Sequence, residues 1–515
     1  MTSTSALVAS ILLASAPVGP SQAGGAPGAN GPLTTSTPPC LDGVPSEWAG
    51  VPPTASDPRG DSEAGALDLG AITLLETPEA LWVRLELAGE PVNIQSLPDE
   101  RSIELIIDAD GSAKSGEVRG TFEGADLLLR FSPQGEGVER PGRGVLVEAI
   151  VPERLDSGRR DRTPSATAAG FGMAPSSAST WIELRLPRAG RGGATGIRFG
   201  DEARISARIV GKDGSVLDDG ATATHRFALK PEAPVKVVEP IPSAAETEPR
   251  VLSWNVERGS IFKNPEPFAE VLRALAPDVL LLQELDATAT EQSLAAWLDE
   301  RAPTEGGWKV VVSGGDLRVA VASPHLAAVP SLAKVSREGP SGSRPVRAIG
   351  AVREFGGRRL LAVSIHLKCC GSIGSSEDRT REAEVSAIGE AIRRAVERAA
   401  SAGQPIDGVV IGGDFNLVGG SAVLELACEG LDLDGSPLTA ADLFTLDRRS
   451  NLTWRDEGSE FLPGRLDFLL FADSRLRLVR GAVVDPASVL PANAQANAPS
   501  DHLPIVADFQ WLGAP

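Results

Sequence analysis

Several polar residues in the second half of the chain interrupt or directly follow apolar runs, where a β-sheet delivers side chains to a shared cleft. Their types suit hydrolysis, because carboxylate and amide oxygens bind hard divalent cations and histidines transfer protons near neutral pH. Each residue alone also has a structural interpretation, such as capping a turn or lying in solvent. The set comprises Asn255, Glu284, His366, Asp414, Asn416, Asp467, Asp501 and His502.

The order of the short motifs around these residues resembles the endonuclease/exonuclease/phosphatase superfamily. The resemblance spans nearly all of residues 250–512, and Gly-Asp-Phe-Asn followed by Ser-Asp-His is its most specific part. It implies a metal-dependent phosphoric ester hydrolase. The motifs are Ser253-Trp254-Asn255-Val256, Gln283-Glu284, Ser364-Ile365-His366-Leu367-Lys368, Gly412-Gly413-Asp414-Phe415-Asn416, Arg465-Leu466-Asp467-Phe468 and Ser500-Asp501-His502-Leu503-Pro504-Ile505.

The resemblance implies a divalent-metal site. Glu284 is expected to be the principal ligand, with Asn255 and Asp501 nearby. Mg²⁺ is the expected ion, because it is satisfied by one or two carboxylates together with water and substrate phosphate. Mn²⁺ and Ca²⁺ are the alternatives, and the number of ions stays open.

The remaining residues of the set are expected to be catalytic. Asp414 is expected to activate the attacking water, with the Asn416 amide orienting that water or the phosphate. The resemblance implies that Asp467 supports the imidazole of His502, and that His366 contacts the scissile phosphate from the other side. Which group acts as acid and which as base stays open.

Basic and polar residues next to these motifs extend the predicted site. Lys368 and Arg344 are expected to contact phosphate, since the superfamily often places basic residues there, although each also reads as a solvated charge. Residues 369–376 lead into a predicted helix, so their N–H groups could bind an anion. The favoured alternative is that Ser375 with Asp378 caps that helix.

Strands and helices alternate around the motifs. Apolar stripes predict one helix through Phe268, Val271, Leu272 and Leu275 and another through Val385, Ile388, Ile392 and Val396. The expected fold is an α/β (α+β) four-layer sandwich, with two β-sheets flanked by helices, preceded by a separate β-sandwich domain. Strands are predicted over residues 251–254, 279–282, 360–366, 408–412, 466–471 and 505–509.

The first half of the chain predicts short half-buried strands without a convincing helix, the pattern of a β-sandwich. Leu41 to Trp48, the run Ala80–Leu87 and Asp108-Ala109-Asp110-Gly111 weakly resemble the carbohydrate-binding family-nine-like and DOMON sandwiches. A polysaccharide ligand is therefore an alternative partner. Asp108 and Asp110 could bind Ca²⁺, but a hairpin turn is favoured. The strands are expected at 81–87, 102–107, 125–131, 145–150, 181–186 and 204–210.

Composition sets the domain organisation. A signal peptide over 1–23 is expected from the apolar run Ala6–Ala14 and Ser21-Gln22-Ala23, despite the absence of a basic residue before Arg59. The protein is therefore expected to be secreted or periplasmic, and no stretch is long and apolar enough to span a membrane. A flexible leader (24–39), the sandwich (40–230), a Pro-rich linker (231–249) and the hydrolase domain (250–515) follow.

The four cysteines suggest one bridge. In an exported protein we expect Cys428 to pair with Cys369 or Cys370, although spacing does not fix the connectivity. Zinc is disfavoured, because adjacent cysteines lack the Cys-x-x-Cys spacing of a tetrahedral site. Because a Pro-rich linker separates the predicted domains, we also expect two independent cores and an active fragment from residue 250 onward.

Charge narrows the choice of substrate. The formal net charge of -20 argues against broad electrostatic binding of nucleic acid, although a local basic patch would be compatible with it. The expected substrate is a nucleic acid or nucleotide-like phosphodiester, and the expected state is a monomer. A sphingomyelinase-like phosphodiesterase acting on phospholipid and a sugar or inositol phosphatase are alternatives within the same fold. A surface polysaccharide-binding protein with an inactive hydrolase domain is the alternative from another class.

Overall fold

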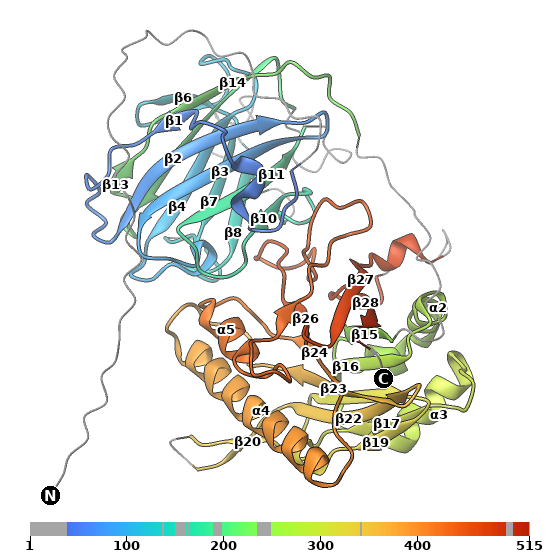
Figure 1. Ribbon diagram of the computed structural model, residues 1–515. Helices are drawn as coiled ribbons and strands as arrows, with labels where there is room; N and C mark the ends of the chain where they lie inside the picture. The colour runs from blue at the N-terminus through green and yellow to red at the C-terminus, as the bar shows by residue number, and fades with distance from the viewer. Residues whose placement is uncertain are drawn as a thin grey trace, which may run out of the picture.

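The computed structural model describes residues 39–135, 138–149, 161–162, 165–188, 198–233, 249–339, 342–490 and 498–513. Two β-rich domains follow one another along these residues, and the N-terminal domain lies above the C-terminal domain in the view of Figure 1. The signal peptide predicted over 1–23, nearly all of the leader over 24–39 and most of the linker over 231–249 lie outside the described residues. No helix in the described part of the chain is long and apolar enough to cross a membrane.

The N-terminal domain is built from two antiparallel sheets. In the first sheet the strand order is β1 (Ala55–Ser56), β2 (Leu67–Glu76), β3 (Ala80–Gly89), β11 (Trp181–Pro187) and β10 (Gly172–Ala174). In the second it is β13 (Val216–Asp219), β12 (Glu202–Val210), β4 (Ser102–Asp108), β7 (Leu127–Phe131), β8 (Val145–Ala149) and β9 (Asp161–Arg162), with β14 (Ala223–Arg226) also pairing β12. A separate hairpin pairs β5 (Glu117–Arg119) with β6 (Phe122–Ala125).

These two sheets pack face to face around one apolar core. Leu81, Val83 and Leu85 alternate along β3 and are buried in this core, and Ile103 and Leu105 of β4 are buried in it from the other sheet. The period-two pattern that predicted strands therefore marks the inner face of each sheet. The predicted β-sandwich is confirmed.

The segment after β4 forms the turn that the sequence favoured. Asp108 Oδ1 accepts a hydrogen bond from the N–H of Gly111 (2.7 Å), and its other oxygen accepts one from Arg204 Nε (2.8 Å). Both oxygens of this buried carboxylate thus have protein partners, so its burial needs no bound cation.

The C-terminal domain contains two larger sheets. One has the order β17 (Lys309–Val312), β18 (Arg318–Ser323), β16 (Val279–Leu285), β15 (Arg250–Asn255), β28 (Ile505–Trp511) and β27 (Leu476–Val483). The other has the order β19 (Leu326–Ala328), β22 (Ala348–Phe355), β23 (Arg358–His366), β24 (Gly408–Asp414), β26 (Asp467–Phe471) and β25 (Thr439–Ala440). A short ribbon pairs β20 (Ser336–Arg337) with β21 (Arg344–Pro345).

Helices cover the outer faces of these sheets. In β15, Leu252 and Trp254 pack in a cluster with the helices α2 (Pro265–Leu275) and α3 (Glu291–Arg301), whereas Val251 packs in the cluster between the sheets. The long helix α4 (Ser376–Ser401) and α5 (Ala422–Cys428) cover the other sheet, and the short α1 (Ser260–Lys263) precedes α2. The predicted four-layer order is therefore confirmed, because each buried strand has one face toward a helix and one toward the other sheet.

A buried polar contact crosses the interface between the two C-terminal sheets. The side chain of Gln283 donates hydrogen bonds to Ser253 Oγ (3.2 Å) and to Ser364 Oγ (3.0 Å), and Ser364 Oγ donates to the carbonyl oxygen of Leu282 (3.0 Å). A buried network whose members are all satisfied specifies one arrangement of the packed layers. It fixes the sheets relative to each other directly beneath the ends of β16 and β23.

The two domains share apolar packing, which contradicts the expectation of independent cores. A segment of the C-terminal domain between β25 and β26, residues 441–466, reaches toward the N-terminal sandwich and is termed here the docking segment (Figure 1). Its Leu462 is 2% exposed and belongs to the sandwich core. Its Leu452 packs with Leu41 and Trp82 of the N-terminal domain. The sequence hid this contact because both leucines lie in a loop without any hydrophobic period.

Candidate active site

The predicted residues lie at one end of the C-terminal sheets. Asn255 ends β15, Glu284 lies near the end of β16, and His366 ends β23. In the sheet register, Asp414 at the end of β24 is the direct neighbour of His366 on one side and of Asp467 on the other. Neighbouring side chains on one face of a sheet lie close together, so the strands themselves assemble the site.

A glycine allows the two central strands to approach. Gly413 precedes Asp414, and a Cβ built on it would lie 1.9 Å from the carbonyl oxygen of Ile365 on β23. No other residue fits at this position without moving the backbone. In the Gly-Gly-Asp-Phe-Asn motif, Gly413 is therefore required for close packing of β24 against β23, and the next residue is Asp414.

Asp414 is the centre of the site. Its Oδ2 atom accepts a hydrogen bond from Asn255 Nδ2 (3.0 Å) and lies 3.6 Å from His366 Nε2 and 3.8 Å from His502 Nε2. Its Oδ1 atom accepts one from the backbone N–H of Asn416 (2.8 Å). Burial raises the pKa of Asp414 to about 7, against the opposing effect of His502.

His502 forms a buried pair with Asp467, as the resemblance implied. His502 Nδ1 lies 2.8 Å from Asp467 Oδ2, so its other ring nitrogen faces Asp414. Burial alone would lower the pKa of His502, but the carboxylates of Asp467 and Asp414 outweigh it and raise the pKa to about 10. This imidazole is therefore protonated at neutral pH.

The pKa of the second histidine, His366, is shifted in the opposite direction to that of His502. His366 is 2% exposed, and burial together with the neighbouring cations of Arg347 and His502 lowers its pKa well below 6.5. Its Nε2 atom lies 3.5 Å from Glu284 Oε1 and faces the same space as Asp414. Two imidazoles of different protonation state thus flank one carboxylate.

Glu284 owes its position to an irregularity of the backbone. The register between β16 and β18 shifts between Leu282 and Leu285, and Glu284 has a φ of 57°, in the left-handed region that non-glycine residues rarely adopt. Such bulges re-aim side chains next to active sites. The carboxylate of Glu284 is thereby brought within 4.8 Å of ligand atoms on His366 and Asp414.

The donor set fits a hard divalent cation. The carboxylates of Glu284, Asp414 and Asp501 all line one cavity. Asp501 Oδ2 accepts a hydrogen bond from Trp454 Nε1 (2.9 Å). Burial, together with the charges of Asp501 and Glu284, raises the pKa of Glu257. The site therefore holds excess negative charge on oxygen atoms, the arrangement that Mg²⁺, Mn²⁺ or Ca²⁺ binds. The structure groups Glu284 with His366 and Asp414, whereas the ligand set expected from the sequence was Glu284 with Asn255 and Asp501.

The other predicted phosphate contacts divide between the cavity and the surface. Asn416 lines the cavity, although its amide nitrogen donates to the carbonyl oxygen of Leu367 (3.2 Å). Lys368 lies next to the cavity wall, with its Nζ atom 4.0 Å from the Sγ atom of the lining residue Cys369. Arg344, by contrast, is exposed on β21 and does not line the cavity. The structure therefore gives no support to Arg344 as a phosphate ligand.

The nearby cation that the sequence interpretation missed is Arg347. Its guanidinium donates to the carbonyl oxygen of Leu367 (2.9 Å) and its charge acts on His366. Ser500 is a second missed residue, since its Oγ accepts from the N–H of His502 (3.1 Å) and donates to the carbonyl oxygen of Asn255 (2.8 Å). The Ser-Asp-His motif contained Ser500, whereas Arg347 has no motif of its own.

The cysteines are arranged differently from the expectation. All four are free, and Cys428 lies buried in the apolar cluster under α4 and α5 instead of bridging to the cavity. The sulfur atoms of Cys369 and Cys370 lie 2.9 Å apart on the wall of the cavity. Contact with Cys369 and the charge of Lys368 lower the pKa of Cys370. The predicted bridge to Cys428 is therefore wrong for this structure.

The loop after the cysteines ends in a helix cap. Ser375 Oγ accepts a hydrogen bond from the N–H of Asp378 at the start of α4 (3.2 Å), as the favoured interpretation predicted. The carboxylate of Asp378 in turn accepts from the N–H groups of Gly374 (3.0 Å) and Gly420 (3.1 Å). The loop is thus held by an internal carboxylate.

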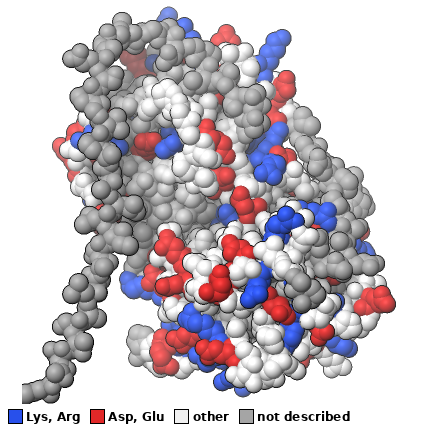
Figure 2. Space-filling model, viewed as in Figure 1, with Lys and Arg blue, Asp and Glu red and all other residues white. Residues whose placement is uncertain are grey.

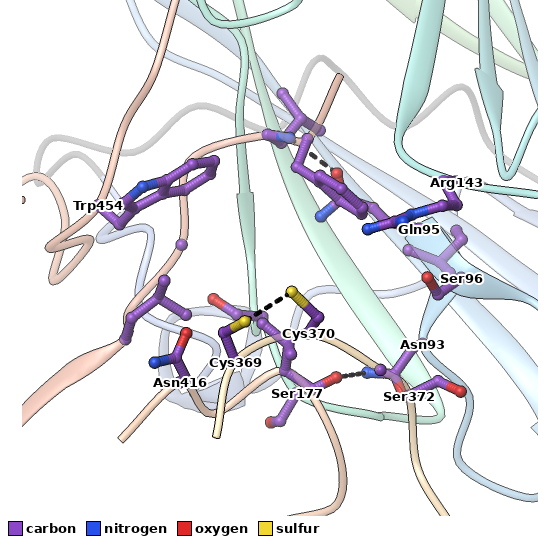
Figure 3. Close-up of a pocket in the computed structure, with 18 of the residues that line it drawn as sticks. Asn93, Gln95, Ser96, Arg143, Ser177, Cys369, Cys370, Ser372, Asn416 and Trp454 are labelled. Atoms are coloured by element: carbon purple, nitrogen blue, oxygen red, sulfur yellow. Dashed lines mark hydrogen bonds between the residues drawn. The ribbon is translucent and has the colours of Figure 1, made fainter. Parts of the chain in front are cut away.

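The site opens into a cavity of about 620 Å³ between the domains. Figure 3 shows Asn416, Cys369 and Cys370 of the C-terminal domain facing Asn93, Gln95 and Arg143 of the N-terminal domain. A cavity of this size is in the range that encloses small ligands. The N-terminal domain was not expected to contribute to the site, because its residues share no motif with the catalytic set.

Comparison with known proteins identifies the C-terminal domain. The model of the Endonuclease/Exonuclease/phosphatase family matches residues 252–502. The C-terminal domain of this chain belongs to that family, whose members hydrolyse phosphoester bonds. A search of curated protein sequences gives no significant match.

A search of solved structures gives matches that cover about half of this chain. The human Nocturnin catalytic domain with bound sulfate is 20% identical, covers 52% of this chain and 94% of its own, and has a TM-score of 0.35. Truncated TDP2 from Caenorhabditis elegans is 20% identical, with coverages of 51% and 97% and a TM-score of 0.36. The 3′ phosphatase NExo from Neisseria, bound to product DNA hairpin, is 21% identical, with coverages of 51% and 99% and a TM-score of 0.35.

Proposed function

We propose that this protein is an exported, divalent-metal-dependent phosphoesterase that hydrolyses phosphodiester bonds by in-line attack of an activated water. The observation that carries the proposal is the convergence on one buried carboxylate. Asp414 Oδ2 lies within 3.8 Å of the facing nitrogen atoms of both His366 and His502 and accepts a hydrogen bond from Asn255. Membership of the Endonuclease/Exonuclease/phosphatase family supports it.

The residues that would hold the cation are Glu284, Asn255 and Asp501. The proximity of Glu284 to His366 and Asp414 supports a position for the cation beside the reacting phosphate. When bound, such an ion polarises the phosphoryl oxygens and offsets the charge that develops on them. Mg²⁺ is the proposed ion, with Mn²⁺ and Ca²⁺ as alternatives.

Asp414 takes the proton of the attacking water. A group that acts as a base works best when its pKa lies near the working pH, and the pKa of Asp414 is raised to about 7. The N–H of Asn416 and the amide of Asn255 fix both oxygens of this carboxylate, so its orientation is set before substrate binds. Fixed orientation is a large part of the rate advantage of an active site.

The two histidines act on the phosphate. His502, protonated and held by Asp467, presents its Nε2 proton toward the reacting group and stabilises negative charge there. His366, neutral because of burial and Arg347, contacts the phosphate through Nε2 from the other side. Together they account for charge stabilisation and for delivery of a proton to the leaving oxygen.

Localisation and substrate complete the proposal. The apolar run Ala6–Ala14 followed by Ser21-Gln22-Ala23 supports export to the periplasm or the medium, and N-terminal sequencing of the mature protein would test the cleavage. On the face shown in Figure 2, acidic and basic side chains are interspersed, in keeping with the net charge of -20. The net charge of -20 favours a small nucleotide-like substrate over long nucleic acid. We propose that the protein acts as a monomer.

The proposal is tested with the purified full chain and bis-p-nitrophenyl phosphate. Hydrolysis should require added Mg²⁺ or Mn²⁺, stop with EDTA and return when excess metal is restored. The Asp414→Asn variant, which keeps the shape of the side chain, is the matched control and should be inactive under the same conditions. Absence of hydrolysis with every metal, and on a panel of DNA, RNA, sphingomyelin and inositol phosphates, would refute the proposal.

A further inference from the structure

The wall of the cavity that faces the catalytic residues belongs to the N-terminal domain. Asn93, Gln95 and Ser96 come from the segment after β3, Arg143 from the segment between β7 and β8, and Ser177 from the segment after β10. Figure 3 shows Gln95, Ser96 and Arg143 on the side of the view opposite Asn416, and Ser177 close to the cysteines. The cavity is therefore complete only when both domains are present.

Hydrogen bonds fix this wall to the C-terminal domain. Asn93 is 7% exposed, and its amide donates to the carbonyl oxygen of Val418 (2.5 Å) and accepts from the N–H of Ile373 (2.7 Å). Gln95 Oε1 accepts from the N–H of Leu462 (2.8 Å). Asn93 is buried and both polar atoms of its amide are hydrogen-bonded, so this part of the wall has one defined arrangement.

The cavity is lined by charged groups of both signs. The carboxylates of Glu284, Asp414 and Asp501 belong to the candidate active site. Arg143 belongs to the N-terminal wall, with its guanidinium 5.5 Å from the centre of the Phe461 ring, and its positive charge acts on Cys370. Within the described residues Arg143 has no ion-pair partner, and this lining residue of the cavity is exposed. A cation in this setting is available to a ligand.

We propose that the N-terminal domain supplies a second substrate-binding subsite and that Arg143 binds there an anionic group other than the scissile phosphate. The inference rests on the proposed phosphoesterase function and names its substrate class. That class is a small phosphodiester in which one of the two esterified alcohols carries a second anionic group. Planar guanidinium groups bind phosphate and carboxylate through paired N–H donors, and the ring of Phe461 supports the guanidinium from one side. A cavity of about 620 Å³ accommodates such a molecule.

The same wall argues against an extended duplex. The N-terminal domain forms one wall of the cavity and contacts the C-terminal domain through Asn93 and Gln95, so a substrate at the catalytic residues has to fit beside this wall. A cavity of about 620 Å³ suits a nucleotide-like ester better than a duplex. The N-terminal domain is thus assigned a role in choosing the substrate.

The test compares dithymidine monophosphate, which has one internal phosphodiester, with its 5′- and 3′-phosphorylated forms, all hydrolysed by the full chain. The wild type should prefer at least one phosphorylated form by about ten- to a hundredfold in kcat/KM, mainly through KM, the usual effect of a charge-assisted hydrogen bond. Arg143→Ala should remove the preference, so that all three probes have equal kcat/KM. Arg143→Lys should retain part of it.

Arg140→Ala is the matched control. Arg140 belongs to the same segment, is exposed, pairs with Glu460 and does not line the cavity, so its loss should leave the preference intact. Equal use of all probes by a wild type that hydrolyses bis-p-nitrophenyl phosphate, or a preference that survives Arg143→Ala, would overturn this inference and leave the proposed function standing. A wild type inactive on every phosphodiester would overturn both.

Discussion

The indole nitrogen of Trp454 donates a hydrogen bond to Asp501 Oδ2 at 2.9 Å. The next residue, Arg455, donates its backbone N–H to the carbonyl oxygen of Asp501 (2.9 Å). Trp454 belongs to the docking segment, whose Leu452 and Leu462 are buried against the N-terminal domain. The docking segment therefore both packs against the N-terminal domain and contacts Asp501, a proposed metal ligand.

Leu462→Ala should therefore reduce both stability and activity. Truncation of a buried leucine in a core costs about 2–5 kcal/mol, and here the loss also frees the segment that holds Asp501. Chemical denaturation and the rate on bis-p-nitrophenyl phosphate measure the two effects. Val479→Ala, at an exposed apolar position on β27, is the control and should change neither. Full activity in a destabilised Leu462→Ala would show that docking does not position the site.

Glu284→Gln should weaken metal binding without unfolding the protein. The substitution removes a ligand charge and preserves the size of the side chain, which is held near His366 and Asp414. Titration of Mg²⁺ against activity and by calorimetry measures the affinity, and circular dichroism checks the fold. An unchanged affinity would exclude Glu284 from the metal site.

The pair of His502 and Asp467 should behave as one unit. His502→Ala should lower kcat by about 10²- to 10⁴-fold, the usual size of positioned acid-base catalysis. Asp467→Asn should cost the same or less, because the imidazole remains but loses the carboxylate 2.8 Å from its Nδ1 atom. The double variant should be little slower than His502→Ala alone, since residues that act together have non-additive effects. Penalties that multiply, in folded variants, would contradict the pairing.

Activity should depend on ionisation of Asp414. Because burial raises its pKa to about 7 and the proposed base must be deprotonated, kcat/KM should rise with pH toward neutrality. Below the pKa the rate should fall by about tenfold per pH unit, the slope for one essential base. A bound cation favours the ionised carboxylate and so lowers the pKa of Asp414. Raising the metal concentration should therefore shift the acid side of the pH profile to lower pH. A rate independent of pH over this limb would remove Asp414 from the role of base.

Mild oxidation should link Cys369 to Cys370 and leave Cys428 free. The two sulfur atoms lie 2.9 Å apart, whereas the thiol of Cys428 is buried in an apolar cluster, which raises its pKa to about 11. Treatment with a small-molecule disulfide, followed by non-reducing peptide mapping, identifies the bridge. A Cys428 bridge to either cysteine would restore the pairing that the sequence suggested. Adjacent cysteines form a strained bridge, so dithiothreitol should reverse the reaction readily.

Most of the candidate site could be located from the sequence because strands fix its residues locally. Asn255, His366 and Asp414 each end a strand with a clear apolar pattern, and a strand end sets the place of its side chain. The predicted strands were too short at the site, since β16 continues to Leu285 and β24 to Asp414. Polar residues end an apolar run in the sequence before the hydrogen-bonded strand itself ends.

The contribution of the N-terminal domain was not predictable for a different reason. Gln95 and Arg143 lie in segments without a hydrophobic period, and their partners are hundreds of residues away in sequence. Arg344 was chosen by its place in a motif, yet the cation that reaches His366 is Arg347. Contacts that depend on how two packed domains meet leave no local pattern, so only the three-dimensional structure reveals them.

The burial of Leu462 in the sandwich has a consequence for how the chain is made. The last strand of the N-terminal domain ends at Arg226, long before Leu462 is synthesised. At the usual ~5–20 residues per second, the N-terminal domain waits roughly 10–50 s for this side chain. Throughout that interval its core carries an open apolar slot. Nascent chains of this protein should therefore recruit chaperones to the first domain after it has folded, and release them only when the docking segment arrives.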